Sequence, residues 1–164
     1  MNSIEPRDDV ASTSTLPPIH RGLLAWSFTV GPALLVLSAG SFALGIGTIP
    51  PGITSWVEGI FGSYALALFV PIYLELSRRL GRTHPRLGAL TAITGLLGAT
   101  CGFAHELARP FEHALRVHGA GDAVWEAFYQ DPTWPYLVVA LLGPLFPLTS
   151  IALGAGFWRA RTLP

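Results

Sequence analysis

The sequence contains no lysine and a single cysteine, and charged residues make up only 12% of its 164 residues. With one cysteine, an internal disulfide and a zinc site built from several cysteines are both excluded. Cys101 lies in an apolar stretch without a cationic neighbour, so we expect a buried, unreactive thiol. Arginines balance the acidic residues and form no basic stripe. The composition therefore does not indicate nucleic-acid binding.

Catalytic and cofactor-binding motifs are also missing from the chain. It has no G-x-S-x-G elbow, no H-E-x-x-H pair, no P-loop and no Rossmann glycine fingerprint. His105 is the only histidine inside an apolar stretch, so a haem held by two buried histidines at one depth is not expected. We predict a non-enzymatic protein without a cofactor or a metal.

What the sequence does contain is four long apolar stretches, at residues 23–46, 56–76, 87–107 and 136–157. A helix needs about 20 mostly apolar residues to cross a bilayer, and none of these stretches has the recurring polar residues of a soluble amphipathic helix. The first stretch is too long for a signal peptide and follows a polar lead. The pattern predicts an all-α polytopic membrane protein, a four-transmembrane-helix bundle with one domain at residues 21–161.

The arginines predict the orientation of this bundle. Eight of them fall on one side of the four stretches: Arg7, Arg21, Arg78, Arg79, Arg82, Arg86, Arg159 and Arg161. Only Arg109 and Arg116 fall on the other side. Because arginine-rich loops stay in the cytoplasm, both termini are expected there (N-in/C-in), and residues 1–20 should form a disordered cytoplasmic tail. The arginines of the inner loop 77–86 set the topology under this interpretation, or they contact anionic lipid head groups.

Tryptophan and tyrosine residues favour the two membrane–water interfaces. We expect Trp26, Tyr73 and Trp158 at the inner interface, and Trp56, Trp134 and Tyr136 at the outer one.

The third stretch carries small residues at intervals of four, three, four and three, namely Gly88, Ala92, Gly95, Ala99 and Gly102. Small residues on one seam allow another helix to approach closely. We expect this helix to be the packing centre of the bundle, or to contact a second copy of the chain or another membrane protein.

The connection 108–135 is the longest one, and its pattern predicts two short helices, at 110–117 and 122–129. Pro110 is expected to redirect the chain at the start of the first. The connection 47–55 is short, with a tight turn at Pro50-Pro51-Gly52. Gly31-Pro32 and Gly143-Pro144 interrupt the first and fourth stretches, where we expect them to adjust the shape of the helices.

Ionisable residues gather near the expected outer surface. Glu58 begins the second stretch, and the third ends in a run that holds His105, Glu106, Arg109 and His113. Glu106 and Arg109 are three residues apart and can pair on one helix. Ionisable groups near a bilayer are costly unless paired, and they often mark functional sites. The cluster is therefore either a structural ion pair at a helix end or a ligand or proton site.

Two segments resemble uncharacterised bacterial multi-helix integral membrane proteins. The first is Leu76-Ser77-Arg78-Arg79-Leu80 before Pro85-Arg86-Leu87-Gly88, and the second is the ending Gly154-Ala155-Gly156-Phe157-Trp158-Arg159-Ala160-Arg161-Thr162-Leu163-Pro164. The resemblance implies a membrane location, in a bacterial inner membrane, and no activity. It also implies that the chain is a shortened relative or a fragment, since similar proteins continue into further helices.

Two functions fit these observations. The first is a non-enzymatic scaffold or accessory subunit that packs through the third helix. The alternative is a small transporter, or an ion or proton permeation unit, that uses the outer polar cluster.

Overall fold

The computed structural model describes residues 18–49, 54–119, 121–131 and 133–160. The tail was predicted to extend to residue 20, but residues 18–20 are helical, which corrects that boundary. The remainder of the predicted tail and the Pro50-Pro51-Gly52 turn lie outside the described residues.

The described chain is almost entirely helical, as predicted. Its elements are α1 (Pro18–Ala43), β1 (Thr48–Ile49), β2 (Thr54–Ser55), α2 (Trp56–Gly81), α3 (Pro85–Val117), α4 (Asp122–Gln130), α5 (Trp134–Leu142) and α6 (Leu145–Ala160). The two-residue strands pair antiparallel, with Thr48 opposite Ser55. By length and composition, four helical segments could cross a membrane: Ile19–Ala43, Trp56–Gly81, Pro85–Val117 and Tyr136–Ala160.

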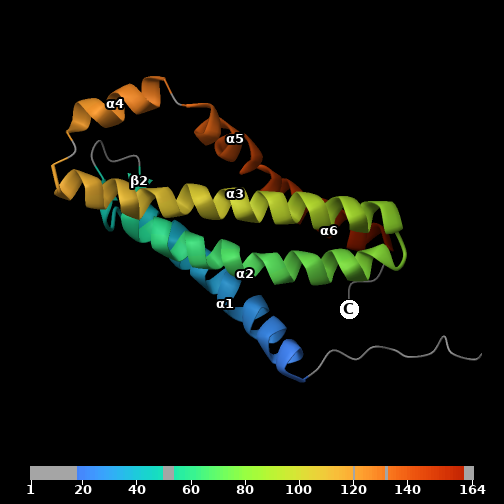
Figure 1. Ribbon diagram of the computed structural model, residues 1–164. Helices are drawn as coiled ribbons and strands as arrows, with labels where there is room; N and C mark the ends of the chain where they lie inside the picture. Colours follow the sequence, from blue (N-terminus) through green and yellow to red (C-terminus); the bar gives the residue numbers. More distant parts are fainter. Residues whose placement is uncertain (1–17, 50–53, 120, 132, 161–164) are drawn as a thin grey trace, which may run out of the picture.

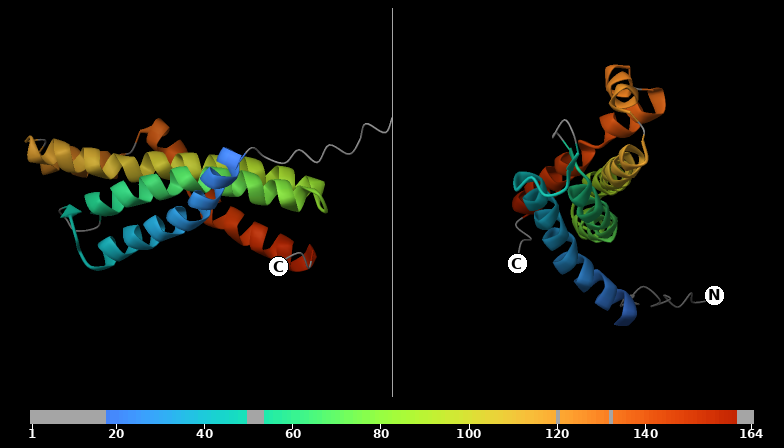
Figure 2. Two further views of the ribbon diagram at one scale, coloured as in Figure 1. Left: turned by 90° about the horizontal axis from the view of Figure 1, so that it is seen from below. Right: turned by 90° about the vertical axis from the view of Figure 1, so that its left-hand side faces the viewer.

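The centre of the structure is the antiparallel pair of α2 and α3, which lie side by side along most of their length (Figure 1). The two helices are in close contact where Gly81 faces Gly88, since a Cβ added to Gly88 would lie 2.5 Å from the Gly81 Cα. Figure 2 shows that α1 and α6 cross this pair at an angle instead of running parallel to it.

The small residues of α3 pack inside the chain. Gly95 faces the Tyr73 ring of α2, Gly102 faces Leu66, and Ala99 has no exposed surface. Gly98 faces the backbone of α6 at Leu145 and Phe146. The seam residues thus pack against α2 and the neighbouring Gly98 packs against α6, while the outward side of α3 carries the exposed residues Leu90, Ile93, Leu96 and Leu97.

Tyr73 is buried in the protein core, whereas its ring was predicted to face the inner membrane interface. Its side chain is only 2% exposed and belongs to the core with Leu80, Ala99 and Leu153. The hydroxyl donates to the Phe146 carbonyl at 2.9 Å and lies 2.6 Å from the Ser150 hydroxyl. The Tyr73 ring points inward because Gly95 leaves room for it and α6 supplies partners for the hydroxyl. The prediction used only the position of Tyr73 along its helix, which does not show the side to which the ring points.

Pro110 does not start a new helix, contrary to the prediction. It lies inside α3, which continues to Val117, so residues 110–117 are the last two turns of a 33-residue helix. At about 1.5 Å per residue this helix is about 48 Å long, well beyond the roughly 30 Å of a hydrocarbon core. The second predicted short helix, at 122–129, corresponds to α4. Of the other prolines, Pro32 stays within α1, whereas the Gly143-Pro144 break separates α5 from α6.

Candidate functional site

The candidate site is built where the first turn of α2 meets α3. Ser55 caps α2, accepting a hydrogen bond from the Glu58 backbone N–H at 3.1 Å, and its hydroxyl donates to the Ile46 carbonyl at 2.6 Å. The Ser38 hydroxyl of α1 donates to the Glu58 carbonyl at 2.9 Å. The Glu58 backbone is therefore held by Ser55 and Ser38. The Glu58 carboxylate lies near the positive end of the α2 helix dipole.

Glu58, Glu106 and Arg109 come together in what we call the Glu–Arg–Glu cluster. The Arg109 Nη1 lies 2.5 Å from Glu58 Oε2 and 2.9 Å from Glu106 Oε2. The three side chains are only 16–17% exposed. The sequence predicted pairing between Glu106 and Arg109 along α3, whereas the packing of two helices adds Glu58 as a second acid.

Two glycines of α2 make this meeting possible, and the sequence analysis missed them. A Cβ on Gly59 would lie 2.6 Å from the Glu106 carbonyl oxygen, and one on Gly62 would lie 2.9 Å from Glu106 Oε2. Any larger residue would push α3 and its two charged side chains away. The signal in the sequence was a pair of glycines three residues apart, directly after Glu58.

The two histidines of the predicted site lie apart from the cluster's ion pairs. His113 stacks on Trp56, with ring centroids 5.4 Å apart and an interplanar angle of 19°. The His105 ring lies 6.1 Å from that of Tyr136, on the side of α3 that faces α5. In the part of the chain that the structure describes, no three His, Cys, Asp or Glu side chains are grouped as metal ligands.

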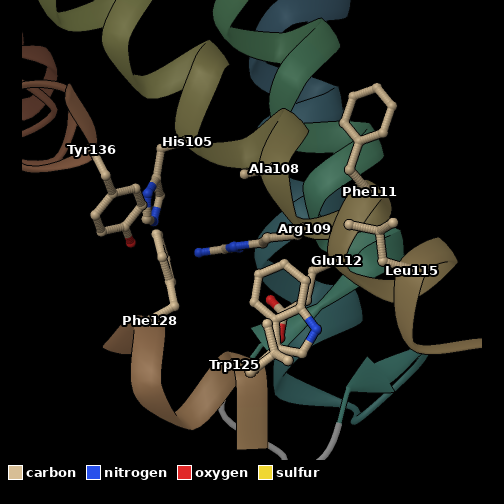
Figure 3. Close-up of a pocket in the computed structure, with 10 residues that line it drawn as sticks. His105, Ala108, Arg109, Phe111, Glu112, Leu115, Trp125, Phe128 and Tyr136 are labelled. Atoms are coloured by element: carbon tan, nitrogen blue, oxygen red, sulfur yellow. The ribbon is translucent and has the colours of Figure 1, made fainter. Parts of the chain in front are cut away.

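Two cavities border the cluster. The larger, which we call the α4 cavity, has a volume of about 630 Å³ and lies between α3, α4 and the start of α5. Arg109 lines it, and Figure 3 shows this side chain extending toward Phe128 and His105, with Trp125 and Glu112 beside it.

The second space, the α5 cavity, has a volume of about 330 Å³ and lies beside the break between α5 and α6. Glu106 lines the α5 cavity, and His105 lines both cavities. The polar cluster is thus reachable from two sides of α3.

The charges of the cluster do not balance. Two carboxylates share one guanidinium, so the cluster would carry a net negative charge if all three groups were ionised. A desolvated net charge is costly. A proton on one carboxylate, or a bound cation, would remove that cost. Two acids with one base could therefore exchange one positive charge while one ion pair stays intact.

A further ion pair holds the end of α3 together. The Glu112 side chain, which is 6% exposed, pairs with Arg116 at 3.1 Å. The Arg116 guanidinium lies 5.6 Å from the centre of the Trp125 ring of α4. This contact links α4 to α3 at Trp125, a residue that lines the α4 cavity. The spacing of four between Glu112 and Arg116 was its sequence signal.

At the opposite end of α2, a second charged group lies around Glu75, which is 8% exposed. Arg78 donates to it at 2.8 and 2.9 Å, and Arg79 at 2.7 Å. Two of the arginines assigned to the inner loop are therefore held by an acid of their own helix.

No family model, curated protein or solved structure matches this chain. These sites are therefore the basis for a proposed function.

Proposed function

We propose that this chain is a multi-pass membrane protein, N-in/C-in, of a bacterial inner membrane. Four long apolar helical segments support insertion. The arginine distribution supports the orientation, because eight of ten arginines fall at one end of these segments. In this orientation the Glu–Arg–Glu cluster and α4 face the outside, and Glu75 lies at the inner end of α2.

Within this framework, we propose that the protein is a small, non-enzymatic transporter or proton permeation unit whose working site is the Glu–Arg–Glu cluster. One observation carries the proposal: two carboxylates and one guanidinium, about five-sixths buried, lie between two cavities. A purely structural ion pair needs neither the second acid nor the cavities. Paired ionisable groups at membrane depth, open to cavities, are typical of ion and proton pathways.

The groups that face Glu106 define how it would act. Glu58 approaches from α2, and Arg109 and His105 lie on its own helix. The other residues that line the α5 cavity, among them Leu35 of α1 and Phe146 of α6, carry no charge or polar side chain. Of the two acids in the Glu–Arg–Glu cluster, Glu106 is the one that lines the α5 cavity. We therefore assign the exchanged proton to its carboxylate, with Arg109 as the fixed counter-charge.

Proteoliposomes test this proposal directly. The purified protein is reconstituted with a trapped pH-sensitive dye, and a membrane potential is imposed. We expect a pH-dependent proton flux that Glu106→Gln reduces to the level of empty liposomes, while Glu126→Gln, at an exposed position of α4, keeps it. Both variants must elute like the unmodified protein on size exclusion. Equal flux in the two variants would refute the proposal.

A scaffold or accessory subunit is the second candidate, and the outward face of α3 favours it. Because the small-residue seam is used inside the chain, a partner or second copy would contact Leu90, Ile93 and Leu97, which are 41–61% exposed. Native mass spectrometry in mild detergent tests this. A defined oligomer that Ile93→Arg converts to a monomer would support it, and a monomer from the start would oppose self-association.

A further inference from the structure

The α4 cavity has the features of a binding site for one class of molecule. Aromatic side chains dominate its walls: Trp125 and Phe128 of α4 and Tyr136 of α5, with Phe128 and Tyr136 in edge contact at 4.9 Å. Phe111 and Leu115 of α3 extend the apolar wall. A space of about 630 Å³ with this lining suits a hydrocarbon body.

Three polar atoms around this cavity lack partners. Arg109 Nε, His105 Nδ1 and Trp125 Nε1 are buried and have no hydrogen-bond partner among the described residues. The arginine and tryptophan atoms can only donate, and His105 Nδ1 donates in one of its tautomers. All three residues line the α4 cavity. A buried donor without an acceptor costs about 1–3 kcal/mol, so an occupant that offers acceptor oxygens would recover this cost.

The charges around the cavity disfavour charged occupants. An anion would be attracted by Arg109 but repelled by Glu58 and Glu106, which already share that guanidinium. Glu106 lines the α5 cavity, so a cation that neutralises the cluster would bind there; in the α4 cavity a cation would meet Arg109 and would offer no acceptor to the unpartnered donors. A neutral molecule with an acceptor oxygen meets neither penalty.

We propose that the α4 cavity binds a neutral lipophilic molecule that presents a carbonyl oxygen to Arg109 and Trp125. This inference deepens the proposed function by naming the class of molecule that enters from the outer side. The apolar body lies against Phe128 and Tyr136, and the carbonyl accepts from the cavity donors. Figure 3 shows Arg109 pointing toward Phe128 and His105, with Tyr136 beyond them.

A chain-matched series of four molecules tests this assignment. The probes are 2-dodecanone, dodecane, dodecanoate and dodecyltrimethylammonium, added to the ¹⁵N-labelled full chain in maltoside micelles. The readout is the indole N–H resonance of Trp125, assigned by its loss in Trp125→Phe. We expect a saturable downfield shift with 2-dodecanone alone, because only this probe is both neutral and a hydrogen-bond acceptor.

Variants sharpen the result. Trp125→Phe keeps an aromatic ring, although a smaller one, and removes the indole N–H donor, so binding of 2-dodecanone, followed on backbone amides of α4, should weaken about fivefold. Trp158→Phe, at an exposed position of α6, should leave it unchanged. No saturable shift with the ketone, an equal shift with dodecane, or tighter binding of either charged probe overturns the proposal.

The outcome separates this inference from the proposed function. Ketone binding without proton flux would leave the cavity assignment standing and refute the permeation unit. Proton flux that depends on Glu106, without ketone binding, would do the reverse.

Discussion

At the scale of single residues, the candidate site depends on the absence of side chains as much as on their presence. Glu58 and Glu106 reach the same arginine only because Gly59 and Gly62 leave no Cβ between the helices. The acids were visible in the sequence, since charges are rare in apolar stretches. The glycines were not recognised, because glycine also occurs in apolar helices for other reasons.

The first prediction concerns Gly59. Gly59→Ala should destabilise the protein by about 1–3 kcal/mol, because the added methyl would overlap the Glu106 carbonyl and Arg109. Gly40→Ala, in α1 with nothing within 4 Å of the added Cβ, should instead stabilise it by about 1 kcal/mol through helix propensity. Thermal unfolding in detergent, followed by circular dichroism, measures both. Equal effects would show that α2 and α3 are not in close contact there.

The second prediction concerns Arg109. Arg109→Leu leaves two carboxylates facing each other and should cost about 2 kcal/mol, less than a fully buried pair would because the groups are partly exposed. Adding Glu58→Gln and Glu106→Gln to the same chain should recover most of that loss. Unfolding free energies of the single and triple variants provide the measurement. A triple variant as unstable as Arg109→Leu would mean that the cost comes from lost packing and not from charge.

At the scale of elements, α3 has two structural roles along its length. Its first two-thirds carry the small residues that pack against α2 and α6, and its last third carries the charged and aromatic groups of the site. Pro110 divides neither part, since α3 continues through it. The prediction of a break failed because a proline removes one backbone hydrogen bond and bends a helix, but packing on both sides can keep the helix going.

The contact between α2 and α6 yields a third prediction. Tyr73→Phe removes the hydroxyl that bonds to the Phe146 carbonyl and Ser150 near the start of α6. We expect a loss of about 1 kcal/mol in stability, the usual net value of one hydrogen bond. Tyr64→Phe, at a position that is 64% exposed, serves as the control. Indistinguishable melting curves for the two variants would contradict the buried position of Tyr73.

At the scale of the whole molecule, the two charged groups lie at opposite ends of α2. The Glu–Arg–Glu cluster is at its first turn, and Glu75 with its two arginines is near its last. The helix between them is about 26 Å long from Glu58 to Glu75, at about 1.5 Å per residue. This separation is close to the thickness of a hydrocarbon core, which supports α2 as a span with one charged group at each surface.

The fourth prediction tests the orientation. Cys101 is the only cysteine, so Cys101→Ser provides a background for single new cysteines. In intact cells, Ala123→Cys on α4 should react with a membrane-impermeant maleimide. Thr83→Cys, in the connection between α2 and α3, should react only after the membrane is permeabilised. The reverse pattern would mean that the arginine-rich end faces outward.

The sequence by itself determined that the chain is almost entirely helical and where its four long apolar segments lie, but not where each helix ends. Long stretches without recurring polar residues favour helices over other structures, so composition and length were enough for that. Tertiary structure decided the rotation of each helix, because helices free of charge in their central turns give little sign of which side faces a neighbour. That rotation turned Tyr73 into the core, buried the seam of α3 within its own chain, and brought Glu58 to Arg109 across two glycines.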